Sequence, residues 1–170
     1  LFLAVRCSDE GYYFKEGDTW IHKSYIKYIC KKGGVKEAIG CVYKDGSNLK
    51  DIALGTSILI GAVEHKCLVE PDNSVQYTQK YVRCSFEGQL YKEGDTWINN
   101  TVKYLCKQNG AIDITHCLSQ GGVEIPVGKR YTEKNIVYSC DLEDNSVFFH
   151  SFRCGYPYPK PCDPPNGQFS

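Results

Sequence analysis

Cysteine is the residue type in this 170-residue chain whose number and spacing could do chemistry. The ten cysteines are Cys7, Cys30, Cys41, Cys67, Cys84, Cys106, Cys117, Cys140, Cys154 and Cys162. Zinc sites and thiol redox motifs use closely spaced pairs such as C-x2-C, and no such pair occurs here. An even number of well-spread cysteines is typical of a disulfide framework in a secreted protein. We therefore predict that all ten form disulfides, and the sequence leaves their pairing open.

The remaining polar residues form no recognisable catalytic or metal-binding motif. The histidines are scattered, and no HExxH, GxSxG, P-loop or GxGxxG pattern occurs. Asp141, Glu143 and Asp144 lack the regular ligand spacing of a calcium loop and are better explained as a solvated turn. The sequence predicts a protein that is not an enzyme and that needs no metal and no cofactor.

Charge and hydropathy narrow the range of partners. Lys plus Arg and Asp plus Glu each number 20, so the net charge is zero, whereas nucleic-acid binding needs a basic field. The apolar start, Leu1 to Val5, is too short to span a bilayer, and it is either the end of a signal peptide or a first strand. No later segment is apolar enough to be a membrane span, so we expect no nucleic acid and no membrane insertion.

The chain contains an internal repeat. The heptapeptide KEGDTWI at residues 15–21 returns at 92–98, and Cys7, Cys30 and Cys41 align with Cys84, Cys106 and Cys117. More weakly, Cys67 aligns with Cys140 and Cys84 with Cys154. This pattern predicts a first module at 1–83, a second at 84–154 and a tail at 155–170. Modules this small bury little core, which is why they need disulfides.

Local patterns favour strands over helices. Ile26, Tyr28 and Cys30 alternate onto one strand face, and Gly33-Gly34 is a two-residue hairpin signal. With that turn, Cys30 faces Glu37 and Cys41 faces Ile26, so the two cysteines lie too far apart to bond each other. We predict an all-β protein of two tandem disulfide-stapled modules, each made of two short antiparallel hairpin-like units, followed by a Pro-rich tail.

Tryptophan and proline mark two further features. Trp20 and Trp97 each follow the repeated turn and are predicted to anchor a module core, with partner binding as the alternative. Five of the seven prolines lie after Cys154, so the tail is expected to be extended, as a linker or as a docking peptide. Cys162 pairs with Cys154, with a cysteine of another module, or with a module further along.

Several residues are candidates for modification or binding. Asn99-Asn100-Thr101 is an N-glycosylation sequon with Asn99 as the acceptor. The longer 41–67 connection of the first module carries apolar residues in a row, for which a buried strand is the alternative, and surface tyrosines suit recognition. The predicted binding residues are Tyr43, Ile58, Leu59, Ile60, Tyr156 and Tyr158.

The order C…G…Y…G-D-x-W…K-Y-x-C…G-C…G…I…G…Y-x-C…C resembles the fibronectin type I-like module of nematode secreted proteins related to abnormal cell migration protein 18. The residues that carry the resemblance are Cys7, Gly17, Trp20, Tyr28, Cys30, Cys41, Gly55 and Cys67, and in the second copy Cys84, Gly94, Trp97, Tyr104, Cys106, Cys117, Ile125, Gly128, Tyr138 and Cys140. A competing resemblance is to complement control protein (sushi) modules. The tail KPCDPPNG is similar to the opening of such a module, but the late tryptophan of that family is missing.

Both resemblances imply small extracellular β modules that bind proteins. We predict a secreted, monomeric, non-enzymatic protein that binds an extracellular partner. The leading hypothesis is a parasitic-nematode effector that binds a host cytokine or cytokine receptor and blocks signalling. The alternatives are an extracellular-matrix protein that influences cell migration, and a protease inhibitor with Lys160 in its reactive loop.

Overall fold

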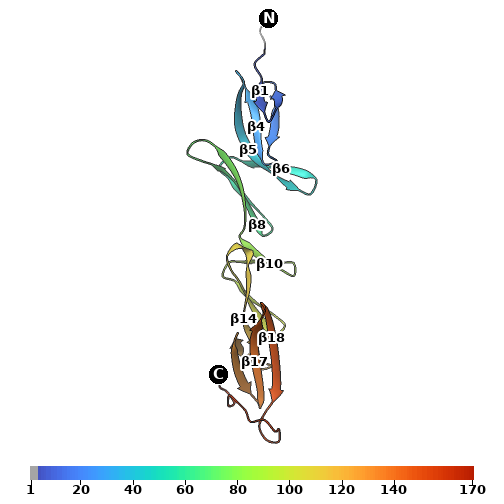
Figure 1. The fold of residues 1–170 in the computed structure, drawn as a ribbon, viewed down its shortest axis with the longest axis vertical. Coiled ribbons are helices and arrows are strands. Elements are labelled where there is room, and N and C mark those ends of the chain that lie inside the picture. Colours follow the sequence, from blue (N-terminus) through green and yellow to red (C-terminus); the bar gives the residue numbers. More distant parts are fainter. Residues whose placement is uncertain (1–3) are drawn as a thin grey trace. The chain divides into compact units, whose positions relative to one another are not determined.

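The computed structural model describes residues 4–170, so the first three residues of the apolar start lie outside it. The described chain consists of antiparallel strands and one short 3-10 turn, Gln108–Gly110 (Figure 1). None of its helical segments is long and apolar enough to cross a membrane. The all-β prediction is confirmed. The chain divides into two compact units, Leu1–Val82 and Arg83–Ser170.

The first unit contains three small antiparallel sheets. Its two-stranded sheet is followed by a four-stranded and then a three-stranded sheet, each in sequence order. The strands are β1 (Cys7–Asp9) and β2 (Tyr12–Phe14); β3 (Thr19–His22), β4 (Ile26–Lys31), β5 (Val35–Asp45) and β6 (Asn48–Ala53); and β7 (Ser57–Ile60), β8 (Val63–Val69) and β9 (Val75–Tyr81).

The second unit repeats this order of sheets. Its strands are β10 (Arg83–Phe86) and β11 (Gln89–Lys92); β12 (Thr96–Asn99), β13 (Val102–Cys106), β14 (Ile112–Leu118) and β15 (Glu124–Pro126); and β16 (Lys129–Glu133), β17 (Ile136–Glu143) and β18 (Ser146–Arg153). Each unit is therefore a series of three sheets, a finer division than the two hairpin-like halves expected from the sequence.

Five disulfides join all ten cysteines. They are Cys7–Cys30, Cys41–Cys67, Cys84–Cys106, Cys117–Cys140 and Cys154–Cys162. In each unit the first disulfide joins the two-stranded to the four-stranded sheet, and the second joins the four-stranded to the three-stranded sheet. Cys84 pairs with Cys106 in the same way as Cys7 pairs with Cys30. The weak sequence alignment of Cys84 with Cys154 therefore does not extend to disulfide pairing, because Cys154 closes a short loop with Cys162.

The hairpin of β4 and β5 differs from its prediction by one residue. Lys31 pairs with Val35, so three residues form the loop and Cys30 faces Lys36. The expected Cys30–Glu37 register is wrong. A β-bulge beside Lys27 then shifts the pairing by one residue, so that Cys41 faces Ile26 as predicted. The second unit has the same bulge at the matching place, between Lys103 and Tyr104.

The repeated heptapeptide begins with a turn that is bonded to the first disulfide. The Asp18 carboxylate accepts a hydrogen bond from the Lys15 backbone N–H at 2.8 Å, and Gly17 takes a φ of 89°. The Gly17 N–H donates to the Cys30 carbonyl at 2.8 Å, and the Cys30 N–H donates to the Asp18 carbonyl at 2.9 Å. The second copy makes the same bonds, so the first four letters recur because this turn is built twice.

The Pro-rich tail folds back onto the second unit. Arg130 in β16 and Ser170 exchange two backbone hydrogen bonds of 3.0 Å each, and the Phe169 ring lies 4.6 Å from the Tyr131 ring. The Asn135 backbone N–H donates to the Asn166 amide oxygen at 2.9 Å. The end of the tail therefore pairs with the edge of a sheet, and the expectation of an extended linker is wrong.

Candidate functional site

A buried carboxylate organises the first unit. Asp9, at the end of β1, accepts hydrogen bonds from Trp20 Nε1 at 2.8 Å, from Lys36 Nζ at 3.0 Å, and lies 2.8 Å from His22 Nδ1. Its side chain is only 6% exposed. Burial by itself raises the pKa of Asp9, but the bonds from Lys36, His22 and Trp20 outweigh burial and lower the pKa to about 2. We call these four residues the Asp9 cluster.

A row of aromatic rings continues from the Asp9 cluster. The Phe14 and Trp20 rings stack at 4.0 Å, and the Tyr28 ring lies 5.8 Å beyond Trp20. Lys36 Nζ lies over the Tyr28 ring at 5.1 Å while it also bonds Asp9. The Lys36 ammonium is thus held in one place by an anion and by an aromatic ring.

The second unit has no such cluster. Phe86 occupies the position of Asp9, and Trp97 stacks on Tyr91 at 3.9 Å. Trp97 is 9% exposed and packs with Cys84 and Cys106, as predicted for a core anchor. Its indole N–H finds no hydrogen-bond acceptor among residues 4–170. Trp20 is only partly buried, so the two tryptophans share a sequence context but differ in their surroundings.

A groove of about 500 Å³ lies beside the Asp9 cluster. Strands β4 and β5 supply one part of its lining, and the β6–β7 turn and the β8–β9 hairpin supply the rest. The lining residues are Tyr28, Lys36, Glu37, Ala38, Leu54, Val69, Asn73, Ser74 and Val75. Apolar side chains with a few fixed polar groups are the usual lining of a recognition site. We call this feature the groove.

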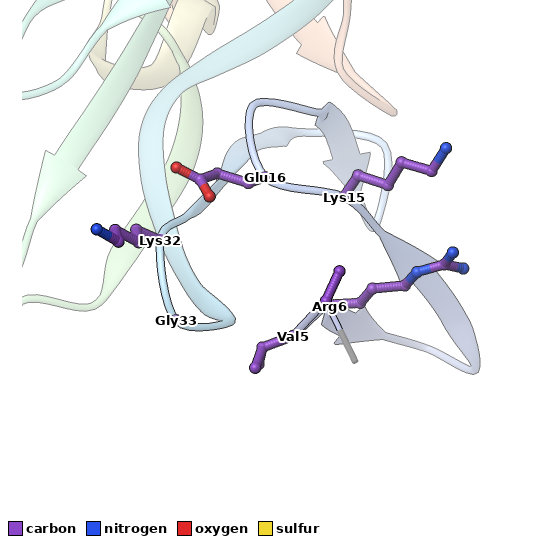
Figure 2. A pocket seen from close by; sticks show the side chains of 7 residues that line it. Val5, Arg6, Lys15, Glu16, Lys32 and Gly33 are labelled. Atoms are coloured by element: carbon purple, nitrogen blue, oxygen red, sulfur yellow. The ribbon is translucent and has the colours of Figure 1, made fainter. Parts of the chain in front are cut away.

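A second hollow, of about 510 Å³, lies where the N-terminal segment passes the β4–β5 turn (Figure 2). Arg6, Lys15 and Lys32 contribute to its lining together with Glu16. Figure 2 shows Arg6 and Lys15 directed to one side and Lys32 to the other, so the three cations do not converge. This hollow is therefore not arranged to hold an anion.

The residues predicted to bind are distributed differently from the expectation. Ile58 packs against the first unit's core, whereas Leu59 and Ile60 are 45% and 37% exposed. Strand alternation places Leu59 on the face opposite Ile58, and Ile60 ends β7 beyond the packed core. Tyr43 also packs against that core, and its ring lies 4.9 Å from the His65 ring. The apolar triplet is thus not a continuous surface patch.

The other predicted residues belong to the second unit. Tyr156 is 97% exposed in the loop closed by Cys154 and Cys162, and Tyr158 accepts a hydrogen bond from Arg153 Nη1 at 2.8 Å. Asn99 ends β12, where its side-chain nitrogen lies 3.3 Å from a Glu87 carboxylate oxygen. Nothing in these contacts tests its glycosylation.

Sequence reasoning missed the Asp9 cluster and the groove. Asp9 lies 11 residues from Trp20, 13 from His22 and 27 from Lys36 along the chain, so no local pattern marks it. The available signal was the mismatch between C-S-D at 7–9 and C-S-F at 84–86 in otherwise matching copies. Among residues 4–170, no group of histidine, cysteine, aspartate or glutamate side chains is arranged to hold a metal ion.

Comparison with known proteins identifies the class of these units. The fibronectin type I domain model matches residues 5–75 and again residues 82–148. This chain belongs to the fibronectin type I domain family, and the first of the two resemblances seen in the sequence is confirmed. Domains of this family are extracellular protein-binding modules.

A relative is found among nematode proteins. An uncharacterized protein of Caenorhabditis elegans is 26% identical over 144 residues, which is 81% of this chain and 56% of that protein. The chain thus spans little more than half the length of this relative. No solved structure matches.

Proposed function

We propose that this chain is a non-enzymatic extracellular protein that binds another extracellular protein through the groove of its first unit. The observation that carries the proposal is the groove's lining, in which exposed apolar side chains lie next to a lysine that is already fixed in position. Leu54 and Val69 are 37% and 47% exposed, and Lys36 is held by Asp9 and Tyr28. Because Lys36 is already fixed, little of its side-chain entropy is lost when a partner binds.

The chemistry of the groove favours a peptide segment with one apolar side chain. Ala38, Leu54, Val69 and Val75 offer apolar contact, while Asn73, Ser74 and Glu37 offer hydrogen-bonding groups around it. None of these residues is a nucleophile paired with a base, which supports binding over catalysis. Because the second unit has Phe86 in place of Asp9, we assign this activity to the first unit.

The family supports an extracellular-matrix type of partner, whereas the narrower hypothesis of a host cytokine or cytokine receptor rests on the sequence resemblance alone. The structure gives little support to the protease-inhibitor alternative, because the Lys160 side chain already contacts a neighbour: its Nζ lies 5.0 Å over the Phe152 ring. We therefore reverse the order expected from the sequence and place the matrix partner first and the cytokine partner second.

The test is capture on the immobilised full chain from two panels, one of matrix proteins and one of cytokines with their receptors. A saturable partner in the first panel would support the matrix role, and one in the second the effector role. Val69→Glu should then weaken binding at least tenfold, as loss of a central contact does. Leu59→Glu is the matched control, because Leu59 is 45% exposed and outside the groove. Equal effects of both changes would rule out the groove.

A further inference from the structure

The repeated heptapeptide ends in two side chains whose duplication the turn does not explain. Trp20 and Trp97 face the inner side of their sheets, but Thr19 and Ile21 alternate onto the opposite face, as do Thr96 and Ile98. Ile21 is 37% exposed and Ile98 is 52% exposed. The two copies have identical residues at exposed positions, where many other residue types would be tolerated.

In the first unit these residues belong to a small surface that combines apolar and charged side chains. Thr19 pairs with Ile29 and Ile29 with Glu37 across β3, β4 and β5, while Ile21 pairs with Lys27. Lys31 Nζ lies 3.5 Å from a Glu37 carboxylate oxygen at one end of this surface. At the other end Lys27 Nζ lies 3.3 Å from an Asp51 carboxylate oxygen. The isoleucines are thus flanked by an ion pair on each side.

The second unit has the same surface, with each cross-strand pair at the equivalent position. Thr96 pairs with Leu105 and Leu105 with Asp113, while Ile98 pairs with Lys103. The end pairs are also kept, with Lys107 Nζ 3.3 Å from Asp113 and Lys103 Nζ 2.8 Å from Glu124. The bond from Lys103 lowers the pKa of Glu124 below its usual value. We call this surface, present once in each unit, the repeated face.

Ordinary divergence does not account for the repeated face. One buried position beside the tryptophan has changed between the copies, since Asp9 is replaced by Phe86. Buried positions normally tolerate change less than exposed ones, because packing constrains them. Here the exposed positions keep their chemistry although the buried position of Asp9 does not. Contact of these exposed residues with another molecule is the simplest explanation.

The charges of the repeated face point to its occupant. Each face carries two lysines along its second strand and two acids on the strands to one side of it. A second face turned over about an axis parallel to the strands therefore places its lysines over the acids. The whole chain has zero net charge and a pI of about 7.0, so copies do not repel each other. We propose that the occupant of the repeated face is a second copy of this chain. This replaces the monomer predicted from the sequence, and of the residues of the repeated face only Glu37 also lines the groove.

The test is sedimentation equilibrium of the full chain over a concentration series that reaches the millimolar range. The average mass should rise from 19.2 kDa toward twice that value or beyond, and added salt should weaken the association because it screens the ion pairs. The double variant Ile21→Glu and Ile98→Glu should stay monomeric. A chain with only one of the two changes should not exceed a dimer.

Matched controls separate the face from general surface hydrophobicity. Leu68 is 37% and Leu142 is 51% exposed, which matches Ile21 and Ile98, and both lie on other sheets. The Leu68→Glu and Leu142→Glu double variant should associate like the original chain. Should the isoleucine variants misfold, Lys31→Glu with Lys107→Glu disturbs only exposed charges and should also weaken association. A chain that is monomeric throughout, or controls that lose association equally, would overturn the proposal.

Discussion

At the scale of single residues, Asp9 shows how one buried acid can define a surface. Its carboxylate orients Trp20, His22 and Lys36 together, and through Lys36 it fixes one wall of the groove. A buried carboxylate is costly unless it is bonded, and these three donors offset that cost. The position of Lys36 therefore depends on an acid near the start of the chain.

We predict that Asp9→Ala destabilises the first unit by about 2 kcal/mol at neutral pH, because it leaves the partly buried donors of Trp20 and His22 without their acceptor. The folded-state pKa of about 2 is lower than the unfolded value of 3.8. The stabilisation by the Asp9 carboxylate is thus complete above about pH 4 and is lost as the pH falls through about 2. Urea unfolding of the original chain and of Asp9→Ala, at pH 7 and at pH 2, measures both effects.

Asp113→Ala is the control for this experiment, since that carboxylate is 56% exposed in a surface ion pair and should cost little. If the stability difference between Asp9→Ala and the original chain were the same at both pH values, the carboxylate would not be the cause. The sequence predicted the role of the cysteines from their number alone. It could not predict Asp9, because its three partners come from two other strands.

At the scale of elements, the turn at Lys15–Asp18 is the part of the fold that sequence chemistry described best. Glycine and aspartate predicted a turn there, and Gly17 and Gly94 both adopt a φ of 89°. The three-residue loop before β5 and the bulge at Ile39 within β5 were not predictable. The loop and the bulge shift the strand register in opposite directions, so Cys41 still pairs with Ile26, as a two-residue turn would also predict.

Gly94→Ala should destabilise the second unit by about 1–2 kcal/mol, because an L-residue is strained at that φ. In the described part of the chain no atom lies close enough to obstruct the added methyl group, so the cost is conformational and not steric. Thermal unfolding followed by circular dichroism measures it. Glu93→Ala, in the same exposed turn, should change the midpoint little, and an equal change in both variants would argue against backbone strain.

At the scale of the whole molecule, the tandem repeat predicted two units, and each has its own disulfides and its own buried clusters. What the repeat could not predict is the tail, because the first unit has no counterpart to it. Proline content suggested an extended linker, yet the residues that decide its position are Asn166, Phe169 and Ser170, which bond or pack against β16 and the turn after it.

Deleting residues 163–170 should therefore destabilise the second unit and leave the first unchanged. The deletion removes the Arg130–Ser170 bonds and uncovers Tyr131, while Cys154–Cys162 is retained. Hydrogen exchange by mass spectrometry should show faster exchange in β16 and β17 and none of this change in β3 to β6. Unaltered exchange in β16 would mean that the tail does not stabilise the sheet.

The unlike surroundings of the two tryptophans have a spectroscopic consequence. Trp20 is partly solvated and donates to a carboxylate, whereas Trp97 is 9% exposed and its indole nitrogen has no acceptor among residues 4–170. Indole emission moves to longer wavelength in polar surroundings, so we expect the fluorescence of Trp20 to be the redder of the two. With one tryptophan in each unit, tryptophan emission excited selectively over tyrosine should distinguish the two halves of the unlabelled chain.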